Sequence, residues 1–464
     1  MTDPRVTSSP GPSDAPRGTG PRFGVEMAAA AALDRVLPEA EYRRRLSREA
    51  RDFLRLERRL RAGVEGDLTR RFCLRAVAEA ERVEYSLLEV GARGNRTFAL
   101  FAEIVTATRW AAKALHALLH LRGRIRRYLG ERRDLDGFRH DLDECIGWLA
   151  GRLGALLESS LVEAEGPLGL EVPADAMEAA VLQGEDVRWR LPQDLDAGEA
   201  EGHPERIADL ATKFLALGEE LERLSLPAPG HLAALDAFVR DAFPASAAQE
   251  ARARMHGIQS TYDTTVAATP VEAEDAELKT FRGFVSILLH LLEAVAYLLQ
   301  IHARLAHDLR SARLRTRAEP ILGTADLLRW AVTFLVTSTI QCVREARGTA
   351  RSVLARYSRV REIALDLPVG RKLHLRPAGL IVRVVQHHGL PVEMRMGEQS
   401  VDARLLMDVI LLAAGHADST QVRFRGDERP LGDLQALFEH RLGEDGFETL
   451  PPSLAYLREG SRGA

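Results

Sequence analysis

The spacing of apolar residues divides this chain into a long helical part and a shorter mixed part. From about residue 40 to residue 357, apolar residues recur three and four positions apart, which is the period of helices with one buried face. After Val360 the period becomes two, because Ile363, Leu365 and Leu367 alternate with polar or small residues. We therefore expect a multidomain protein, mostly α at first and α+β towards its C-terminal end.

The helical part is predicted to form two antiparallel bundles, over residues 25–165 and 204–357. The stretch between them, 166–203, contains several prolines, glycines and acidic residues that interrupt the helical period, so it is predicted to be a linker. The pattern Thr-Phe-x-x-Phe-x-x-Ile at 97–104 recurs at 280–287. Each copy opens the longest apolar helix of its half, which favours a duplicated bundle, although any two core helices share apolar spacing.

The mixed part, residues 360–445, is predicted to have the element order βαββαβα with its helices on one face of a sheet. The chain before it begins with residues 1–24, rich in Pro, Gly and Ser, which we expect to be a disordered tail, and residues 446–464 are expected to form a second tail. The strands are expected near 360–367, 392–396, 400–402 and 422–424, and the helices near 375–388, 405–413 and 431–438.

Composition narrows the possible partners and the compartment. The formal net charge of −4 over 464 residues gives no global basic field, which argues against nucleic acid as the main partner. The most apolar helices carry internal polar residues such as Glu103 and His290, so we expect core helices and no membrane span. Three widely spaced cysteines and an N-terminus without an apolar signal segment point to a cytoplasmic protein.

One short run in the mixed part suggests chemistry. His374 stands just before a predicted helix whose first turn holds Arg376 and Pro377. Proline is tolerated in a first helical turn, and the unpaired N–H groups and positive dipole end at that place favour an anion such as a phosphate. The imidazole can accept a phosphoryl group and the guanidinium can neutralise its charge.

The run Leu-His-Leu-Arg-Pro-Ala-Gly-Leu at 373–380 resembles the active-site run of the histidine-containing phosphocarrier protein (HPr) family of the bacterial phosphotransferase system. Residues 401–414 match the second-helix segment of that family in register. The resemblance implies an open-faced β-sandwich that carries a phosphoryl group and is not itself a free-standing catalyst. It implies phosphorylation of a histidine ring nitrogen by enzyme I, with phosphoenolpyruvate as the ultimate donor, and no cofactor.

Carried onto this chain, the resemblance assigns a role to five residues. His374 becomes the phosphoacceptor and Arg376 the side chain that stabilises the phosphate. Leu406, Met407 and Ile410 occupy the positions of an apolar docking patch for partners. The expected partners are an enzyme I-like donor and an unknown acceptor or regulated protein, with the helical region in a regulatory role.

Four residues depart from the family pattern. Leu405 replaces a serine that is phosphorylated by a regulatory kinase in many relatives, and Asp408 places a carboxylate in the docking segment. Lys372 and Leu375 flank His374 where small residues are usual. These departures support an alternative function, a scaffold whose HPr-like domain docks partners without being phosphorylated.

Three other groups have the composition of possible sites, but they are expected to be structural. His116 and His120 lie four apart on one predicted helix and could bind a metal if a neighbouring helix supplied a carboxylate. Asp141, Asp143 and Glu144 could ligate a hard cation, but acidic residues in a first helical turn more often serve the dipole. The arginine-rich stretch at 122–133 is expected to be a solvated helix face, and no metal site is predicted.

Overall fold

The computed structural model describes residues 36–61, 68–129, 136–178, 204–228, 230–309, 311–367, 373–444 and 446–459. The tail predicted at 1–24 and the greater part of the predicted linker lie outside the described residues.

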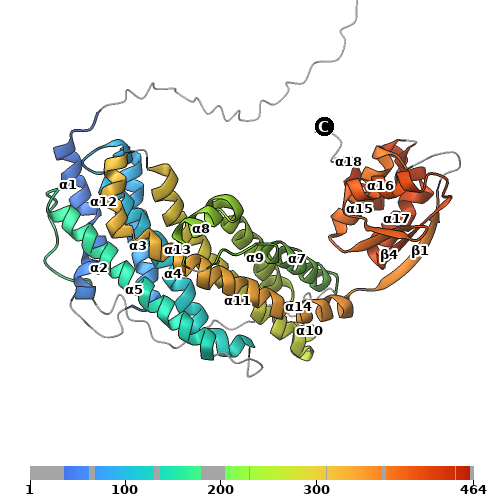
Figure 1. Ribbon diagram of the computed structural model, residues 1–464, viewed down its shortest axis with the longest axis horizontal. Coiled ribbons are helices and arrows are strands. Elements are labelled where there is room, and N and C mark those ends of the chain that lie inside the picture. Colours follow the sequence, from blue (N-terminus) through green and yellow to red (C-terminus); the bar gives the residue numbers. More distant parts are fainter. Residues whose placement is uncertain are drawn as a thin grey trace, which may run out of the picture.

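Helices make up the part of the chain before residue 358, and they lie alongside one another in an elongated array (Figure 1). The longest are α4 (Ala99–Leu129), α5 (Asp136–Glu165) and α11 (Ala276–Ala303). The others are α1 (Glu39–Glu49), α2 (Arg51–Arg61), α3 (Arg70–Glu89), α7 (Pro204–Glu222), α8 (Leu232–Ala237), α9 (Ala245–Thr265), α10 (Pro270–Glu274), α12 (Ala312–Leu322), α13 (Thr324–Leu328) and α14 (Thr337–Tyr357).

The two halves of the helical region, which were predicted to be two antiparallel bundles, share one hydrophobic core. A single cluster of buried apolar side chains runs from Tyr42 to Val353, through helices of both halves. At its centre α4 and α11 pack against each other, with Trp110 stacked on Tyr297 at 5.5 Å between ring centroids. Each of these two helices also packs against the helices that flank it in its own half, as a duplicated arrangement would require.

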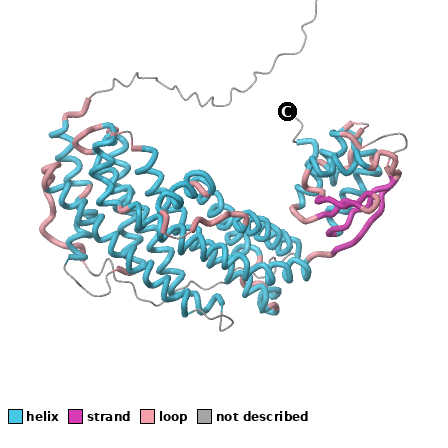
Figure 2. Tube along the Cα trace, viewed as in Figure 1, coloured by secondary structure: helices cyan, strands magenta, loops and turns pink. Residues whose placement is uncertain are grey.

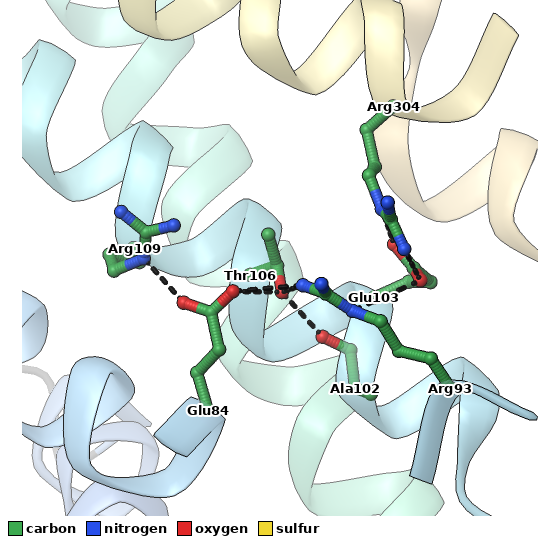
Figure 3. Close-up of polar contacts among 7 residues, drawn as sticks. All are labelled: Glu84, Arg93, Ala102, Glu103, Thr106, Arg109 and Arg304. Carbon is green, nitrogen blue, oxygen red and sulfur yellow. Dashed lines mark hydrogen bonds and ion pairs between the residues drawn. The ribbon is translucent and has the colours of Figure 1, made fainter. Parts of the chain in front are cut away.

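Buried ionic contacts reinforce the junction between the halves (Figure 3). The guanidinium of Arg304, just after α11, makes two hydrogen bonds of 2.8 Å to the carboxylate of Glu103 on α4. One helical turn further along, Glu84 on α3 accepts hydrogen bonds from Arg93 at 2.9 Å and Arg109 at 2.6 Å. The hydroxyl of Thr106 lies 2.9 Å from the same Glu84 carboxylate, so α3 and α4 are joined as well.

The start of the predicted linker belongs to the helical core. Leu168, Leu170 and Met177 follow α5 without helical period, yet all three are buried in the cluster described above. The apolar side chains therefore hold this segment to the core, although its prolines and glycines prevent it from forming a helix.

Two helices are long and apolar enough to cross a membrane, judged by length and composition. They are Asp136–Glu165 and Ala276–Ala306. The helices Ala312–Leu322 and Thr324–Tyr357, which meet at a bend of 62°, satisfy the same criteria when they are taken as one span. Within the protein, 78% of the most apolar window of Ala276–Ala306 is buried and 44% of that of Asp136–Glu165.

The C-terminal domain is an antiparallel sheet with helices on one face, and the predicted order βαββαβα is confirmed. Figure 2 shows its strands on one side and its helices on the other. The spatial strand order is β1-β4-β2-β3. The strands are β1 (Val360–Asp366), β2 (Val392–Met396), β3 (Gln399–Asp402) and β4 (Gln421–Asp427), and the main helices are α15 (Leu375–His388), α16 (Leu406–Gly415) and α17 (Glu428–Glu439).

Alternation along the strands builds the core of this domain. Met394 pairs with Phe424 across β2 and β4, and both are fully buried beneath the helices, while Arg395 pairs with Arg423 on the exposed face. The predicted period of two therefore corresponds to one covered and one open face.

The domain continues beyond residue 445, so the predicted tail at 446–464 begins too early. Short helical turns at Phe447–Thr449 and Pro452–Leu454 lead to α18 (Tyr456–Glu459). Leu450, Leu454 and Leu457 are buried in the core of the C-terminal domain, which explains why this segment folds against it.

Candidate functional site

His374 occupies the N-terminal boundary of α15 and faces solvent. Its backbone is extended, with φ −102° and ψ −176°, and its side chain does not cap the helix. The carbonyl oxygen of His374 accepts a hydrogen bond from the backbone N–H of Ala378, so the helical hydrogen bonding begins at this residue. Pro377 and Ala378 are buried, which anchors the helix start while the imidazole, 58% exposed, remains accessible.

A carboxylate that the sequence did not single out lies beside this imidazole. Glu444 places Oε1 3.3 Å from Nε2 of His374, an ion pair when the ring is protonated. The Glu444 side chain is only 17% exposed, because it lies in the loop after α17 that packs towards the start of α15. Because Nε2 faces this carboxylate, the other ring nitrogen, Nδ1, is the one that can attack an incoming electrophile when it carries a lone pair.

Arg376 lies in the first turn of α15, as predicted. Its side chain is exposed and reaches the same loop, with Nη2 3.5 Å from the carbonyl oxygen of Gly443. Gly443 has φ +66°, and a side chain there would meet Leu380, so the close approach of loop and helix depends on glycine. The guanidinium and the positive end of α15 therefore lie on the same side of the domain as His374.

The helix α16 and the residue just before it carry exposed apolar side chains. Of the three predicted docking residues, Met407 is exposed, whereas Leu406 and Ile410 are half-buried against the domain core. The exposed members also include two residues that the sequence did not assign to docking, Leu405 and Leu411. Each of these three exposed side chains has more than half of its surface in contact with solvent.

The residues that depart from the family pattern fall in different surroundings. Leu375 is 64% exposed next to His374, so its bulk stands at the rim of the site without covering the imidazole. Asp408 lies in the first turn of α16, where a carboxylate is favourable for the helix dipole. Lys372 lies outside the described residues.

The helical region approaches this domain at the opposite end of α15. Gly389 ends that helix with φ +67°, and a Cβ there would lie 2.9 Å from the Asp209 carboxylate on α7. The 14 residues of α15 separate this contact from His374 by about 21 Å. The helices of the described region therefore leave the imidazole open.

Comparison with known families decides the nature of this domain. Residues 361–440 match the family model described as the PTS HPr component phosphorylation site. The C-terminal domain is an HPr domain. No curated protein and no solved structure matches the chain.

An HPr domain is a phosphocarrier component rather than a catalyst, so this part of the chain has a carrier's architecture. The match contains His374, Arg376 and all of α16, and it ends before Glu444 and the short turns that complete the HPr domain. The helical region before residue 361 has no counterpart in the match.

The three remaining candidate groups differ in their surroundings. His140, Asp141 and Glu144 are exposed and place donor atoms within 4.8 Å of one another on the first turns of α5. Asp143 instead lies 3.6 Å from Arg122, which belongs to α4. His116 and His120 are half-buried on α4. The ring of His120 lies 4.3 Å from the ring of His290 on α11, measured between centroids.

The three cysteines are free and buried, as expected for residues in helical core positions. Burial raises the pKa of Cys73 and of Cys145 to about 12, so both are protonated thiols near neutral pH.

Proposed function

We propose that this protein accepts a phosphoryl group on His374 from an enzyme I-type donor and acts as a cytoplasmic phosphocarrier or phosphorelay protein. The observation that carries the proposal is the position of His374 within the matched segment, exposed at the start of α15 with Nε2 beside Glu444. Arg376 and the helix dipole then stabilise the doubly charged product.

The transfer step uses the nitrogen that Glu444 leaves available. The Nδ1 lone pair of His374 attacks phosphorus, the new N–P bond forms, and the bond between phosphorus and the donor's histidine breaks. The electron pair of the broken bond returns to the donor imidazole, so no other reactant is needed, and Nε2 of His374 faces Glu444 during the step.

The exposed face of α16 supports docking of a protein partner during this step. Leu405, Met407 and Leu411 form an exposed apolar surface of the kind found at the centre of transient interfaces. A regulatory role of the helical region fits a signal that begins as a charge change at His374.

The same apolar surface supports the second candidate function, a scaffold that binds partners without phosphorylation. The bulky Leu375 at the rim of the site is the feature that favours it. The two functions share the docking surface and differ in whether His374 is modified.

Incubation of the full-length protein with enzyme I and phosphoenolpyruvate, followed by intact mass measurement without acid, separates the two functions. The phosphocarrier function predicts the gain of one phosphoryl group, absent in His374→Ala. His387→Ala is the matched control, because His387 is exposed at the other end of the same helix, and it should retain the gain. No gain in the wild-type protein, with docking of enzyme I still measurable, would establish the scaffold function instead.

A further inference from the structure

Three histidines and one glutamate lie together in the helical region, far from the HPr domain. His116 and His120 are on α4, and His290 and Glu293 are on α11. All four are half-buried, whereas most of their helix neighbours are fully buried apolar residues. They therefore form a short polar stripe along the junction of the two central helices.

The register of α4 and α11 brings the four side chains to the same level. Glu103 meets Arg304 near one end of the junction, and Trp110 stacks on Tyr297 further along. Residue numbers therefore rise along α4 while those of the facing residues on α11 fall, so the two helices are antiparallel. The next contact in the series places the rings of His120 and His290 4.3 Å apart between centroids.

Hydrogen bonds already link part of the group. His290 Nδ1 lies 2.9 Å from the Glu293 carboxylate, one turn along α11. His116 Nε2 lies 3.4 Å from the guanidinium of Arg70, the first residue of α3, and the electrostatic influence of Glu293 and His290 reaches it as well. The stripe therefore adds a third histidine and a carboxylate to the histidine pair on α4.

We propose that His116, His120, His290 and Glu293 bind a divalent transition-metal ion of the zinc type and crosslink α4 to α11. Helical bundles hold metal ions with side chains that project inward from facing helices, and histidine and carboxylate are common ligands of zinc. The proposal goes beyond phosphocarrier function and does not depend on it.

The charges around the stripe favour this class of ion over hard cations. Arg70 and Arg124 both act on the histidines, and Glu293 is the one carboxylate of the four ligands. Ca²⁺ and Mg²⁺ require several oxygen ligands and net negative charge, whereas zinc-type ions gain from coordinate bonds to neutral imidazole.

Binding requires side-chain rotations that bring the four ligand atoms together. The ion replaces the hydrogen bond between His290 and Glu293, and the His116 ring turns away from Arg70, an exposed residue at the end of its helix. Among the described residues, donor atoms already within 4.8 Å of one another are those of His140, Asp141 and Glu144, an exposed group that supplies the control.

The test is calorimetric titration of the chelator-treated full-length protein with Zn²⁺, together with the visible absorption of the Co²⁺ form. We expect one high-affinity ion whose affinity falls roughly tenfold or more in His120→Gln, His290→Gln and Glu293→Gln. His140→Gln should leave it unchanged. The Co²⁺ spectrum of the wild type should show intense d–d bands that disappear in the His290→Gln variant.

A second readout guards against misfolded variants. Zn²⁺ should raise the unfolding temperature of the wild type and of His140→Gln, but not that of His290→Gln, provided its helical circular dichroism without metal matches the wild type. The proposal is overturned if the wild type binds no Zn²⁺, if the ion is lost in His140→Gln, or if a natively folded His120→Gln, His290→Gln double variant still binds it with unchanged affinity.

Discussion

One ring nitrogen of His374 lies beside a carboxylate, and the proposed chemistry of the site depends on this contact. Nε2 lies 3.3 Å from Glu444, while the side chain as a whole is 58% exposed at the start of α15. In the proposed transfer Glu444 is a positioning residue, because its carboxylate faces Nε2 and orients the imidazole without touching the phosphoryl group.

Replacement of Glu444 by glutamine should therefore slow phosphorylation without weakening docking. The loss of one charge-assisted contact predicts a roughly tenfold lower rate of phosphoryl transfer from enzyme I at saturation. The KM for enzyme I should stay within about twofold, because Glu444 is not part of the exposed α16 surface. Glu439→Gln, an exposed carboxylate on α17, is the control, and an equal effect in both variants contradicts the positioning role.

At the scale of single elements, a polar cluster ties three helices of the HPr domain together. The Asp433 carboxylate on α17 lies 2.8 Å from His388 Nε2 on α15 and accepts a hydrogen bond of 2.8 Å from the Tyr456 hydroxyl on α18. The Tyr456 ring also stacks on His387 at 3.6 Å between centroids. This cluster fixes the C-terminal segment at the end of α15 that is remote from His374.

The cluster makes the stability of the HPr domain depend on pH. Burial raises the pKa of Asp433, but the hydrogen bonds from His388 and Tyr456 outweigh burial and hold that pKa below the ordinary value of 3.8. A carboxyl whose pKa is lowered by folding stabilises the folded state above its unfolded pKa, and this stabilisation is lost as pH falls through the folded pKa.

Asp433→Asn should consequently lower the free energy of unfolding at pH 7 by about 1–3 kcal/mol. The difference from the wild type should shrink below about pH 4, where the wild-type carboxyl becomes protonated. Denaturant unfolding at several pH values measures this. A difference that is constant from pH 7 to pH 3 would show that the charge of Asp433 is not involved.

The C-terminal turns also contribute to the HPr domain core. Leu454→Ala removes a fully buried side chain and should reduce the free energy of unfolding of the domain by about 2–5 kcal/mol. Leu411→Ala is the control, since that leucine is 63% exposed and should change stability by less than about 0.5 kcal/mol. Denaturant unfolding of both variants checks the difference, and equal stabilities would contradict the packing of residues 446–459 into the core.

These elements also show what sequence alone can predict. The strands and helices of the HPr domain were predictable because Met394 and Phe424 alternate with exposed residues and α15 begins at a proline-containing turn. The segment at 446–459 was missed because Pro451 and Pro452 interrupt the helical spacing of its leucines and are typical of a loop. Glu444 was missed because its contact with His374 is made across 70 positions of chain and has no local signal.

At the scale of the whole molecule, a single core unites the two halves of the helical region. The apolar faces of α4 and α11 were predictable from their spacing, but spacing does not state which helix each face will meet. In the folded protein α4 and α11 pack against each other. Glu103 and Arg304 form an ion pair across this junction, and the Glu103 side chain is only 2% exposed. The halves should therefore unfold together.

Glu103→Ala tests this junction, because it leaves Arg304 without the carboxylate to which it makes two hydrogen bonds. Breaking a buried ion pair by removing one partner costs about 3–5 kcal/mol, and the loss should appear as one cooperative transition of the helical region. Arg329→Ala, which breaks an exposed pair with Asp326, should cost less than about 1 kcal/mol. Two separate transitions in the wild-type helical region would contradict a shared core.

The position of the phosphoryl group on the protein is the most direct test of the proposal that His374 carries it. The full-length protein is phosphorylated with enzyme I and phosphoenolpyruvate, and the histidine rings are then examined by long-range nitrogen–proton NMR without acid treatment. The account predicts a single phosphohistidine, His374, modified at Nδ1. A phosphoryl group on any other residue, or its complete absence while enzyme I remains active on a control carrier, would contradict it.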